Sequence, residues 1–419
     1  MFAGGLTLDA AEAVAAGGAI AASDVLDLLT GLVDKSLVAI DADTGRYAML
    51  ETVRQYAMER LDASHEGESV RERHLDFHLA LVEGAAAGLS GPEQPRWLER
   101  LDRARENILA AHAWSLRAPD ACARSYRLVY AIRHYWFLRG MLELGHRITL
   151  DTAAGCPSAH AGVARGRALW AAGQICAFMA RYTEAQVYLE ESLRIARAQG
   201  ERRMVAGVLN TLALATFGQG DAVAAREKSE EALAIARDLN DERRIAMASN
   251  ALAHLHRFDG RLDAAEPLYD EALGLSRKLG DHEMEAVGLL NLAMVAIGRS
   301  ADAQAVDLLR QVLAIATETQ SRQAMQSFFE VAAGFAASMK DWQRAARLFG
   351  TAERHMNETG IRRDPADEAF LSPWLARAGD ALGREQFARQ LAAGGSVPFE
   401  KARDEAGDWL AELAGMRTR

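Results

Sequence analysis

The sequence predicts a mostly α-helical chain, with a small mixed module at its front and an α–α superhelix of 40-residue repeats behind it. Three observations lead to this fold class. Two short alternating apolar runs near the N-terminus flank turn-forming residues, small residues recur every 40 positions in the second half, and the apolar residues of each repeat follow helical spacing. The 419 residues, 50% of them hydrophobic, are enough for about two or three domains.

The front module, residues 1–65, is predicted from the stretch between Leu28 and Leu61. A helix running to about Val33 is followed by the short runs SLVAI and RYAML, and the residues DADTG between them favour a hairpin. A further helix is expected from about Glu51. Helix, hairpin, helix is the order of a winged helix, a shape that many DNA-binding proteins use.

The acidity of this module argues against DNA binding. Residues 1–65 hold four basic and ten acidic side chains, a formal charge of -6, and the whole chain carries -10. The expected recognition helix, DVLDLLTGLVDKS, offers Lys35 beside three aspartates, whereas base edges are usually read by several Arg, Lys, Asn or Gln side chains. We therefore expect a packing or hinge module, with a transcription factor that binds DNA through residues 1–65 as the alternative.

Three columns of small residues define the repeats of residues 161–360. They step by 40 positions and are Ala185, Ala225, Ala265, Ala305 and Ala345; Gly173, Ala213, Ala253, Ala293 and Ala333; and Ser192, Ala232, Ala272, Val312 and Ala352. Each repeat is expected to be a helical hairpin, because a break such as GQGD separates two amphipathic segments. Small side chains let helices cross closely, and hairpins with two apolar faces must stack into a superhelix.

The columns resemble the tetratricopeptide repeat, which has small residues at the corresponding places of its unit. The usual unit is about 34 residues long, so longer helices or loops are expected to absorb the difference. Residues 66–160 are predicted to form degenerate hairpins that join the solenoid, with a helix from Pro95 to Arg117 and a turn at Gly140. Residues 361–419 lose the repeat phase and are expected to form a C-terminal helical cap.

A second resemblance is carried by MFAGGLTLDAAEAV, LLTGLVDKSLV, RYAMLETVRQYAMERL and GPEQPRWLERLDRARENILAAHAWSL, and near the C-terminus by LGREQFARQLAAGGSVPFEKARDEA. These segments are similar to the part that follows the nucleotide-binding domain in bacterial signal-transduction ATPases with numerous domains. Such regulators occur fused to LuxR-type or SARP-type DNA-binding domains or to nucleotide cyclases. The resemblance implies a winged helix that packs on the ATPase, repeats that sense a ligand or partner, and a chain that is the sensory half of such a regulator.

No catalytic or metal-binding constellation is predicted. The sequence has no GxxxxGK[ST] phosphate loop and no nucleophile elbow, so we expect a non-enzymatic chain without a cofactor. His74 and His78 are four apart on a presumed helix but have no third ligand nearby, and the three cysteines lack metal-ligand spacing, so no metal site is expected. The cysteine usage and the lack of a secretory signal favour the cytoplasm.

Ligand binding is expected in the concave groove, which the first helix of each hairpin lines in tetratricopeptide repeats. The residues at these places are Trp170, Gln174, Asn210, Phe217, Asn250, His254 and Arg257. Such a wall suits a protein, a peptide or a small inducer, with a partly exposed Arg257 holding an anionic or amide-bearing ligand, although Trp170 and Phe217 could instead be core residues. We therefore predict a sensor or scaffold of a bacterial regulator, with a separate ATPase or output domain among its partners and no direct nucleic-acid or membrane contact.

Overall fold

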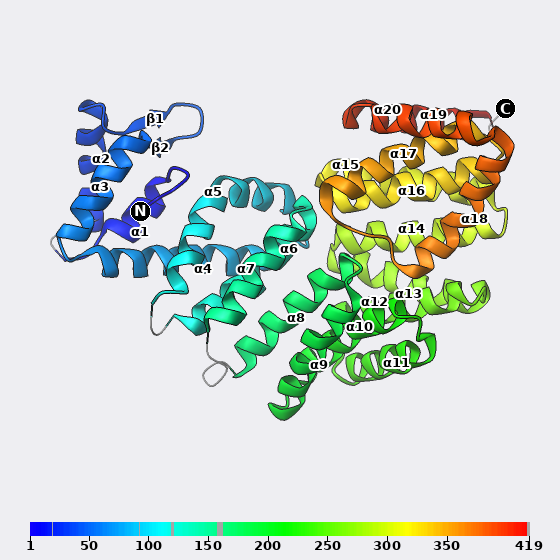
Figure 1. The fold of residues 1–419 in the computed structure, drawn as a ribbon, viewed down its shortest axis with the longest axis horizontal. Coiled ribbons are helices and arrows are strands. Elements are labelled where there is room, and N and C mark those ends of the chain that lie inside the picture. The colour runs from blue at the N-terminus through cyan, green and yellow to red at the C-terminus, as the bar shows by residue number, and fades with distance from the viewer. Residues whose placement is uncertain (19, 92, 119–120, 157–161, 417–419) are drawn as a thin grey trace.

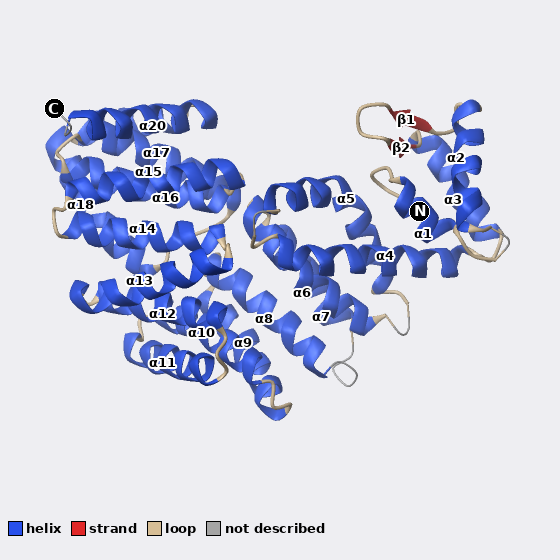
Figure 2. Cartoon of the chain, turned by 180° about the vertical axis from the view of Figure 1, so that it is seen from behind, coloured by secondary structure: helices blue, strands red, loops and turns tan. Residues whose placement is uncertain are grey.

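The chain is almost entirely helical, as the sequence predicts, and its described residues hold one two-stranded sheet (Figure 1, Figure 2). The computed structural model describes residues 1–18, 20–91, 93–118, 121–156 and 162–416. None of the described helices combines the length and the apolar character needed to cross a membrane.

The front of the chain is a small module of helices and one hairpin. Its elements are α1 (Leu8–Ala15), the short 3-10 helix η1 (Ala22–Asp24), α2 (Val25–Asp34), β1 (Ala39–Asp41), β2 (Arg46–Ala48) and α3 (Glu51–Ala63). The two runs that flank DADTG form the antiparallel hairpin, and Leu6 extends it by a bridge to Tyr47. The module has its own apolar core, and it also rests on α4 through Phe2, whose ring meets His74 edge-on at 5.2 Å.

Four helices connect this module to the regular repeats. They are α4 (Gly67–Gly88), α5 (Gln94–Ser115), α6 (Cys122–Arg139) and α7 (Leu142–Gly155). The expected turn at Gly140 separates α6 from α7, and this glycine takes the left-handed conformation that ends α6 (φ 65°). Large buried side chains, among them Tyr126, Tyr135 and Trp136, fill the core of this region.

The repeats consist of helices of nearly equal length. They are α8 (Gly162–Phe178), α9 (Tyr182–Ala198), α10 (Arg202–Gly218), α11 (Ala222–Asp238), α12 (Glu242–Phe258), α13 (Leu262–Leu279), α14 (His282–Gly298), α15 (Asp302–Thr319), α16 (Arg322–Ser338) and α17 (Trp342–Thr359). Those of the central repeats, such as α10, α11 and α12, have 17 residues each and are separated by only three. Longer helices, and not longer loops, therefore account for the 40-residue unit.

The turns between these helices contain residues with a left-handed backbone that recur every 20 positions. They are Ala180, Gly200, Gly220, Asn240, Gly260, Gly280, Ser300, Gln320, Lys340 and Gly360. The next residue often caps the following helix, as where the carboxylates of Asp221 and Asp281 accept hydrogen bonds from the N–H groups of Ala224 and Met284. The acidic segment DHEME, which begins at Asp281, is thus the start of α14.

The columns of small residues lie where helices cross. All five alanines of the first column, from Ala185 to Ala345, are 0% exposed. In the second column, a Cβ on Gly173 would lie 2.5 Å from Leu189 Cγ and 3.2 Å from the Ala185 carbonyl oxygen, so α8 crosses α9 with no room for a side chain. The predicted repeat phase is confirmed.

Replacing Ala265 with leucine is expected to destabilise the fold by roughly 1–3 kcal/mol, because the larger side chain must push α12 and α13 apart. Glu230→Leu, on the exposed face of α11, is the control and should change the free energy of unfolding little. Urea unfolding measures the difference, and equal midpoints for the two variants would contradict the assigned phase.

The superhelix curls until its later repeats return to its beginning. In Figure 1 the chain passes from α8 to α9–α13 at the bottom and rises through α14–α17, and α16 comes back to contact α6. The remaining helices are α18 (Pro365–Leu382), α19 (Arg384–Gly395) and α20 (Phe399–Met416). α19 crosses α17 so closely that a Cβ on Gly394 would lie 1.9 Å from the Arg347 carbonyl oxygen, and α20 packs against α15.

The connection from α17 to α18 does more than cap the last repeat. Residues 360–367, which comprise this connection and the first three residues of α18, cross the concave side of the superhelix, and we call them the strap. The N–H of Arg362 donates to the carbonyl oxygen of Phe178 at 2.8 Å, and Gln326 Nε2 donates to that of Ile361 at 3.4 Å. The strap therefore joins α8 to α16 across the space that the repeats enclose.

Candidate functional site

A cavity of about 320 Å³ lies on the concave side of the superhelix, between its inner helices and the strap. The walls come from α6, α8, α10, α12, α14 and α16, and the strap and the start of α18 complete the lining. Five of the groove residues predicted from the sequence line it, namely Gln174, Asn210, Phe217, Asn250 and His254. A cavity of this size, with a few polar groups among apolar walls, has the character of a ligand site.

A chain of hydrogen bonds crosses one wall of the cavity and ends on the strap. Asn291 Nδ2 donates to Asn250 Oδ1 at 2.8 Å, Asn250 Nδ2 lies 3.4 Å from His254 Nε2, and His254 Nδ1 lies 3.3 Å from Asp364 Oδ2. All these contacts are satisfied when His254 accepts from Asn250 and donates to Asp364. Burial alone would raise the pKa of Asp364, but its attraction to His254 and the hydrogen bond between them lower that pKa to about 2.

Other polar atoms of the cavity wall have no hydrogen-bond partner within the described part of the chain. They are three buried acceptors, Gln174 Oε1, Asn210 Oδ1 and Glu283 Oε2, and one buried donor, Arg363 Nη1, which faces the carboxyl of Glu330 at 3.8 Å. A buried acceptor without a donor costs about 1–3 kcal/mol. A ligand with N–H groups would recover part of this energy, so the wall is suited to binding.

Arg257, which the sequence led us to expect partly exposed in the groove, is buried and lies outside the cavity lining. Its guanidinium donates to Tyr269 Oη at 3.1 Å and to the Ala366 carbonyl oxygen at 3.0 Å, and it pairs with Asp367. The side chain is only 5% exposed. The expected exposure of Arg257 is therefore wrong, because α18 returns to α12 and this arginine holds the end of the strap.

Trp170 also lies outside the cavity lining. The residue is 3% exposed, its Nε1 donates to Thr211 Oγ1 at 3.0 Å, and Tyr130 of α6 packs beside the ring at 5.8 Å. At this end of the solenoid the preceding hairpin covers the concave face, so Trp170 is a core residue. Phe217 is both a core residue and a cavity residue, since it packs edge-on against Phe258 at 4.9 Å and also lines the cavity.

Sequence reasoning missed several parts of the cavity wall, namely Asn291, Glu283, Glu330 and the strap. The position of Glu330 could have been predicted, because it differs from those of Asn210 and Asn250 by multiples of 40 residues. Glu330 therefore occupies the same place on its inner helix as these asparagines do on theirs. Asn291 is one position out of that column. The strap gives no repeat signal, since it follows the last periodic helix.

Glu330 is a buried carboxyl with weak partners. It is 6% exposed, and its Oε1 lies 3.4 Å from Gln326 Nε2 and 3.8 Å from Arg363 Nη1. Burial raises the pKa of Glu330 to about 8, although the charge of Arg363 opposes this. At neutral pH this side chain is therefore mostly protonated.

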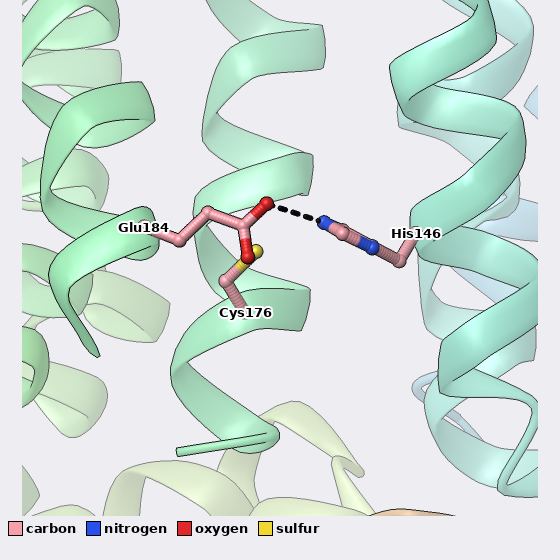
Figure 3. Close-up of side chains that lie close together, drawn as sticks. All are labelled: His146, Cys176 and Glu184. Atoms are coloured by element: carbon pink, nitrogen blue, oxygen red, sulfur yellow. Dashed lines mark hydrogen bonds and ion pairs between the residues drawn. The ribbon is translucent and has the colours of Figure 1, made fainter. Parts of the chain in front are cut away.

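A second cluster of reactive side chains lies outside the cavity, between α7, α8 and α9 (Figure 3). His146, Cys176 and Glu184 point toward one another, with their potential ligand atoms within 4.8 Å. His146 Nε2 is 3.1 Å from Glu184 Oε1, and Arg181 Nη1 faces His146 Nδ1 at 3.3 Å. Since arginine can only donate, the ring proton lies on Nε2 and is donated to Glu184. Burial raises the pKa of the Cys176 thiol to about 12, so a metal would have to displace both protons, and the absence of a metal site stays a prediction.

Comparison with known proteins supports the repeat assignment. Two family models, each described as tetratricopeptide repeat, match residues 166–199 and 244–318. The chain is a tetratricopeptide-like solenoid. Aspartyl phosphate phosphatase F from Bacillus subtilis has a similar fold, with a TM-score of 0.53 and 11% identity over 82% of this chain and 83% of that one. A Rap protein complexed with competence and sporulation factor gives a TM-score of 0.50 and 12% identity over 81% of this chain and 96% of that one.

Relatives with higher sequence identity cover less of the chain. A Mycobacterium tuberculosis protein that carries the name "Putative HTH-type transcriptional regulator" is 39% identical over an alignment 170 residues long, which covers 36% of this chain and 19% of the relative. A second protein of the same species, named only as uncharacterized, is 40% identical over 95 residues, 21% of this chain and 24% of its own length. The similarity thus spans about a fifth to a quarter of these curated relatives.

Proposed function

We propose that this chain is the non-catalytic sensor part of a bacterial signalling or transcriptional regulator and that it binds a peptide or small amide-bearing inducer in the cavity. The observation that carries this proposal is the set of amides Gln174, Asn210, Asn250 and Asn291 on one cavity wall, two of them with unpaired acceptor atoms. Amide side chains both donate and accept, so they can pair with the main chain of a peptide. The Rap protein of similar fold was solved with competence and sporulation factor, and the name of the mycobacterial relative places it among regulators, which agrees with this role.

The strap gives the proposed sensor a route for its signal. Asn250 is connected to Asp364 through His254, so a ligand that takes the amide of Asn250 competes with a contact that holds the strap. The end of α17, from which the strap leaves, lies against the α6–α7 turn, where a Cβ on Gly140 would be 2.6 Å from Thr359 Cγ2. Because α6 packs on α4, which carries the front module, a displaced strap can act on that module.

We propose further that the front module docks on a protein, such as a separate ATPase or output domain. It exposes several large apolar side chains, namely Leu26, Leu28, Ile40, Leu50 and Tyr56, which are 45–73% exposed. Its charge of -6 disfavours phosphate contacts. The name of the mycobacterial relative favours the alternative, DNA binding through residues 1–65, and a sequence-specific shift of duplex DNA by this chain at physiological salt would establish it.

Asn250→Ala is expected to weaken a cavity ligand by about 1 kcal/mol, roughly fivefold, because it removes an amide partner from the wall. Pools of pentapeptides screened by thermal shift supply the ligand, and isothermal titration of the strongest binder measures the change. Asn357→Ala, which alters an exposed asparagine of α17, is the matched control. A ligand that binds both variants as tightly as the wild type would place the site elsewhere.

A further inference from the structure

Glu283 is a cavity carboxyl without a cationic partner. It stands in the first turn of α14 and lines the cavity beside Met284. Ser321 Oγ, at the start of α16, donates to Glu283 Oε1 at 3.2 Å, whereas Glu283 Oε2 is buried and has no hydrogen-bond partner. No cation of the described residues forms an ion pair with it. A buried carboxylate in this position is costly unless a donor or a positive charge reaches it.

The other acidic groups of the cavity already have a hydrogen-bond donor or a cation beside them. Asp364 lies 3.3 Å from His254, Asp367 pairs with Arg257, and Glu330 is 3.8 Å from Arg363. These groups thus have partners within the protein itself, and Glu330 is in addition mostly protonated at neutral pH.

The two arginines that line the cavity are also engaged. Arg363 Nε donates to Glu368 at 2.9 Å, and Arg362 Nη1 donates to the Met356 carbonyl oxygen at 3.0 Å. Arg363 Nη1 makes no hydrogen bond, but it faces the carboxyl of Glu330 at 3.8 Å. The groups of the wall that have no such neighbour are the oxygens of Gln174 and Asn210 and the carboxyl of Glu283. The wall thus favours a positively charged ligand, whereas an exposed Arg257 would have favoured a negatively charged one.

We infer that the cavity selects a ligand bearing a guanidinium or ammonium group, which Glu283 binds while the amides of the same wall hold the ligand's neutral polar groups. This inference rests on the proposed function of the cavity and adds the charge of the ligand to it. Gln323 of α16 and His134 of α6 line the same cavity. Burial, followed by Arg133 and Arg243, lowers the pKa of His134 well below its ordinary value, so this imidazole does not compete with a ligand cation by its own charge.

The protonation of Glu283 provides an independent readout. Burial, and secondarily the charge of Asp281, raise the pKa of Glu283 to about 7, against the hydrogen bond from Ser321; Asp281 is itself paired with Arg243 at 2.9 Å. A cation that binds beside Glu283 stabilises its ionised form and lowers this pKa. Binding at pH 7 therefore releases protons, and affinity rises as the pH goes from 6 to 8.

The test compares three pools of pentapeptides, acetylated and amidated at their ends, with arginine, citrulline or glutamate fixed at the central position. Isothermal titration on the full chain should show the arginine pool binding roughly 10- to 100-fold more tightly than the neutral citrulline pool, and the glutamate pool most weakly. Titration in phosphate and in Tris, which differ in ionisation enthalpy, should show proton release for arginine only. Glu283→Gln should remove both the arginine preference and the proton release.

A matched control stands two residues along the same helix. Glu285 is paired with Arg277 at 2.9 Å and does not line the cavity, so Glu285→Gln should keep the arginine preference. Retention of that preference in Glu283→Gln, or glutamate peptides that bind as tightly as arginine peptides, would overturn the inference.

A cavity-filling variant separates this inference from the proposed function. Ala251 lines the cavity, and Ala251→Phe should block a ligand there. If the three pools bind equally and Ala251→Phe abolishes their binding, the cavity is a ligand site and only its charge preference is wrong. Binding that Ala251→Phe leaves intact, or no binding of any pool, would count against both proposals.

Discussion

Replacing Arg257 with alanine is expected to lower the free energy of unfolding by about 3–5 kcal/mol, the usual effect of removing one partner from a buried ion pair. Three contacts are lost at once, to Tyr269 Oη, to the Ala366 carbonyl oxygen and to the carboxylate of Asp367. The half-buried carboxyl of Asp367 would lose the guanidinium that favours its ionised form, and the strap would lose its anchor on α12. Urea unfolding followed by circular dichroism measures the change.

The control for this prediction is Arg261→Ala, four residues further along the chain. Arg261 pairs with Asp259 at the surface with its side chain 51% exposed, so its loss should cost less than about 1 kcal/mol. The double variant Arg257→Met with Asp367→Leu should recover part of the stability, because it removes both charges and refills the volume. Equal unfolding midpoints for Arg257→Ala and Arg261→Ala would mean that the strap is not held in this way.

The repeats could be predicted from the sequence because each crossing imposes the same steric limit. Ala225 and Ala265 face another helix at the same place in successive hairpins, where only small side chains fit. Small residues therefore recur at intervals of 40 positions in the sequence. The left-handed turns recur just as regularly, but they are harder to see. The glycine at position 220 indicates a turn from the sequence alone. Ala180 and Lys340 adopt the same left-handed conformation without being glycine, since tertiary packing fixes the helix ends.

The candidate site could be predicted only where it follows the repeat. Asn210 and Asn250 face the cavity because they occupy the same place on two inner helices. Trp170 has that place too, but α6 covers it, since the first repeat packs on an irregular hairpin. The role of Arg257 depends on Asp367, which is 110 residues away and outside the periodic region, so no local pattern could reveal it.

Glu330→Gln is expected to stabilise the protein at alkaline pH and to change little at pH 5. The pKa of Glu330 is raised from about 4.5 to about 8, first by burial and also by Asp367 and Glu368, against the effects of Arg363 and Gln326. The folded state therefore holds this proton more tightly than the unfolded state does. By linkage, the wild type loses stability as the pH rises from about 4.5 to about 8, and above that range it bears the full cost of a buried charge.

Glutamine imitates the protonated carboxyl and carries no proton to lose, so the variant escapes this pH-dependent cost. The difference in unfolding free energy between Glu330→Gln and the wild type should grow with pH to the order of 5 kcal/mol by pH 9. Thermal unfolding at intervals from pH 5 to pH 9 follows the difference. Glu318→Gln, on an exposed site of α15, is the control and should show a constant, small difference. If the difference in unfolding free energy for Glu330→Gln also stays constant with pH, Arg363 must neutralise the carboxylate of Glu330 in the folded protein. This would happen if Arg363 Nη1 and Glu330 Oε1 moved from 3.8 Å to hydrogen-bond distance.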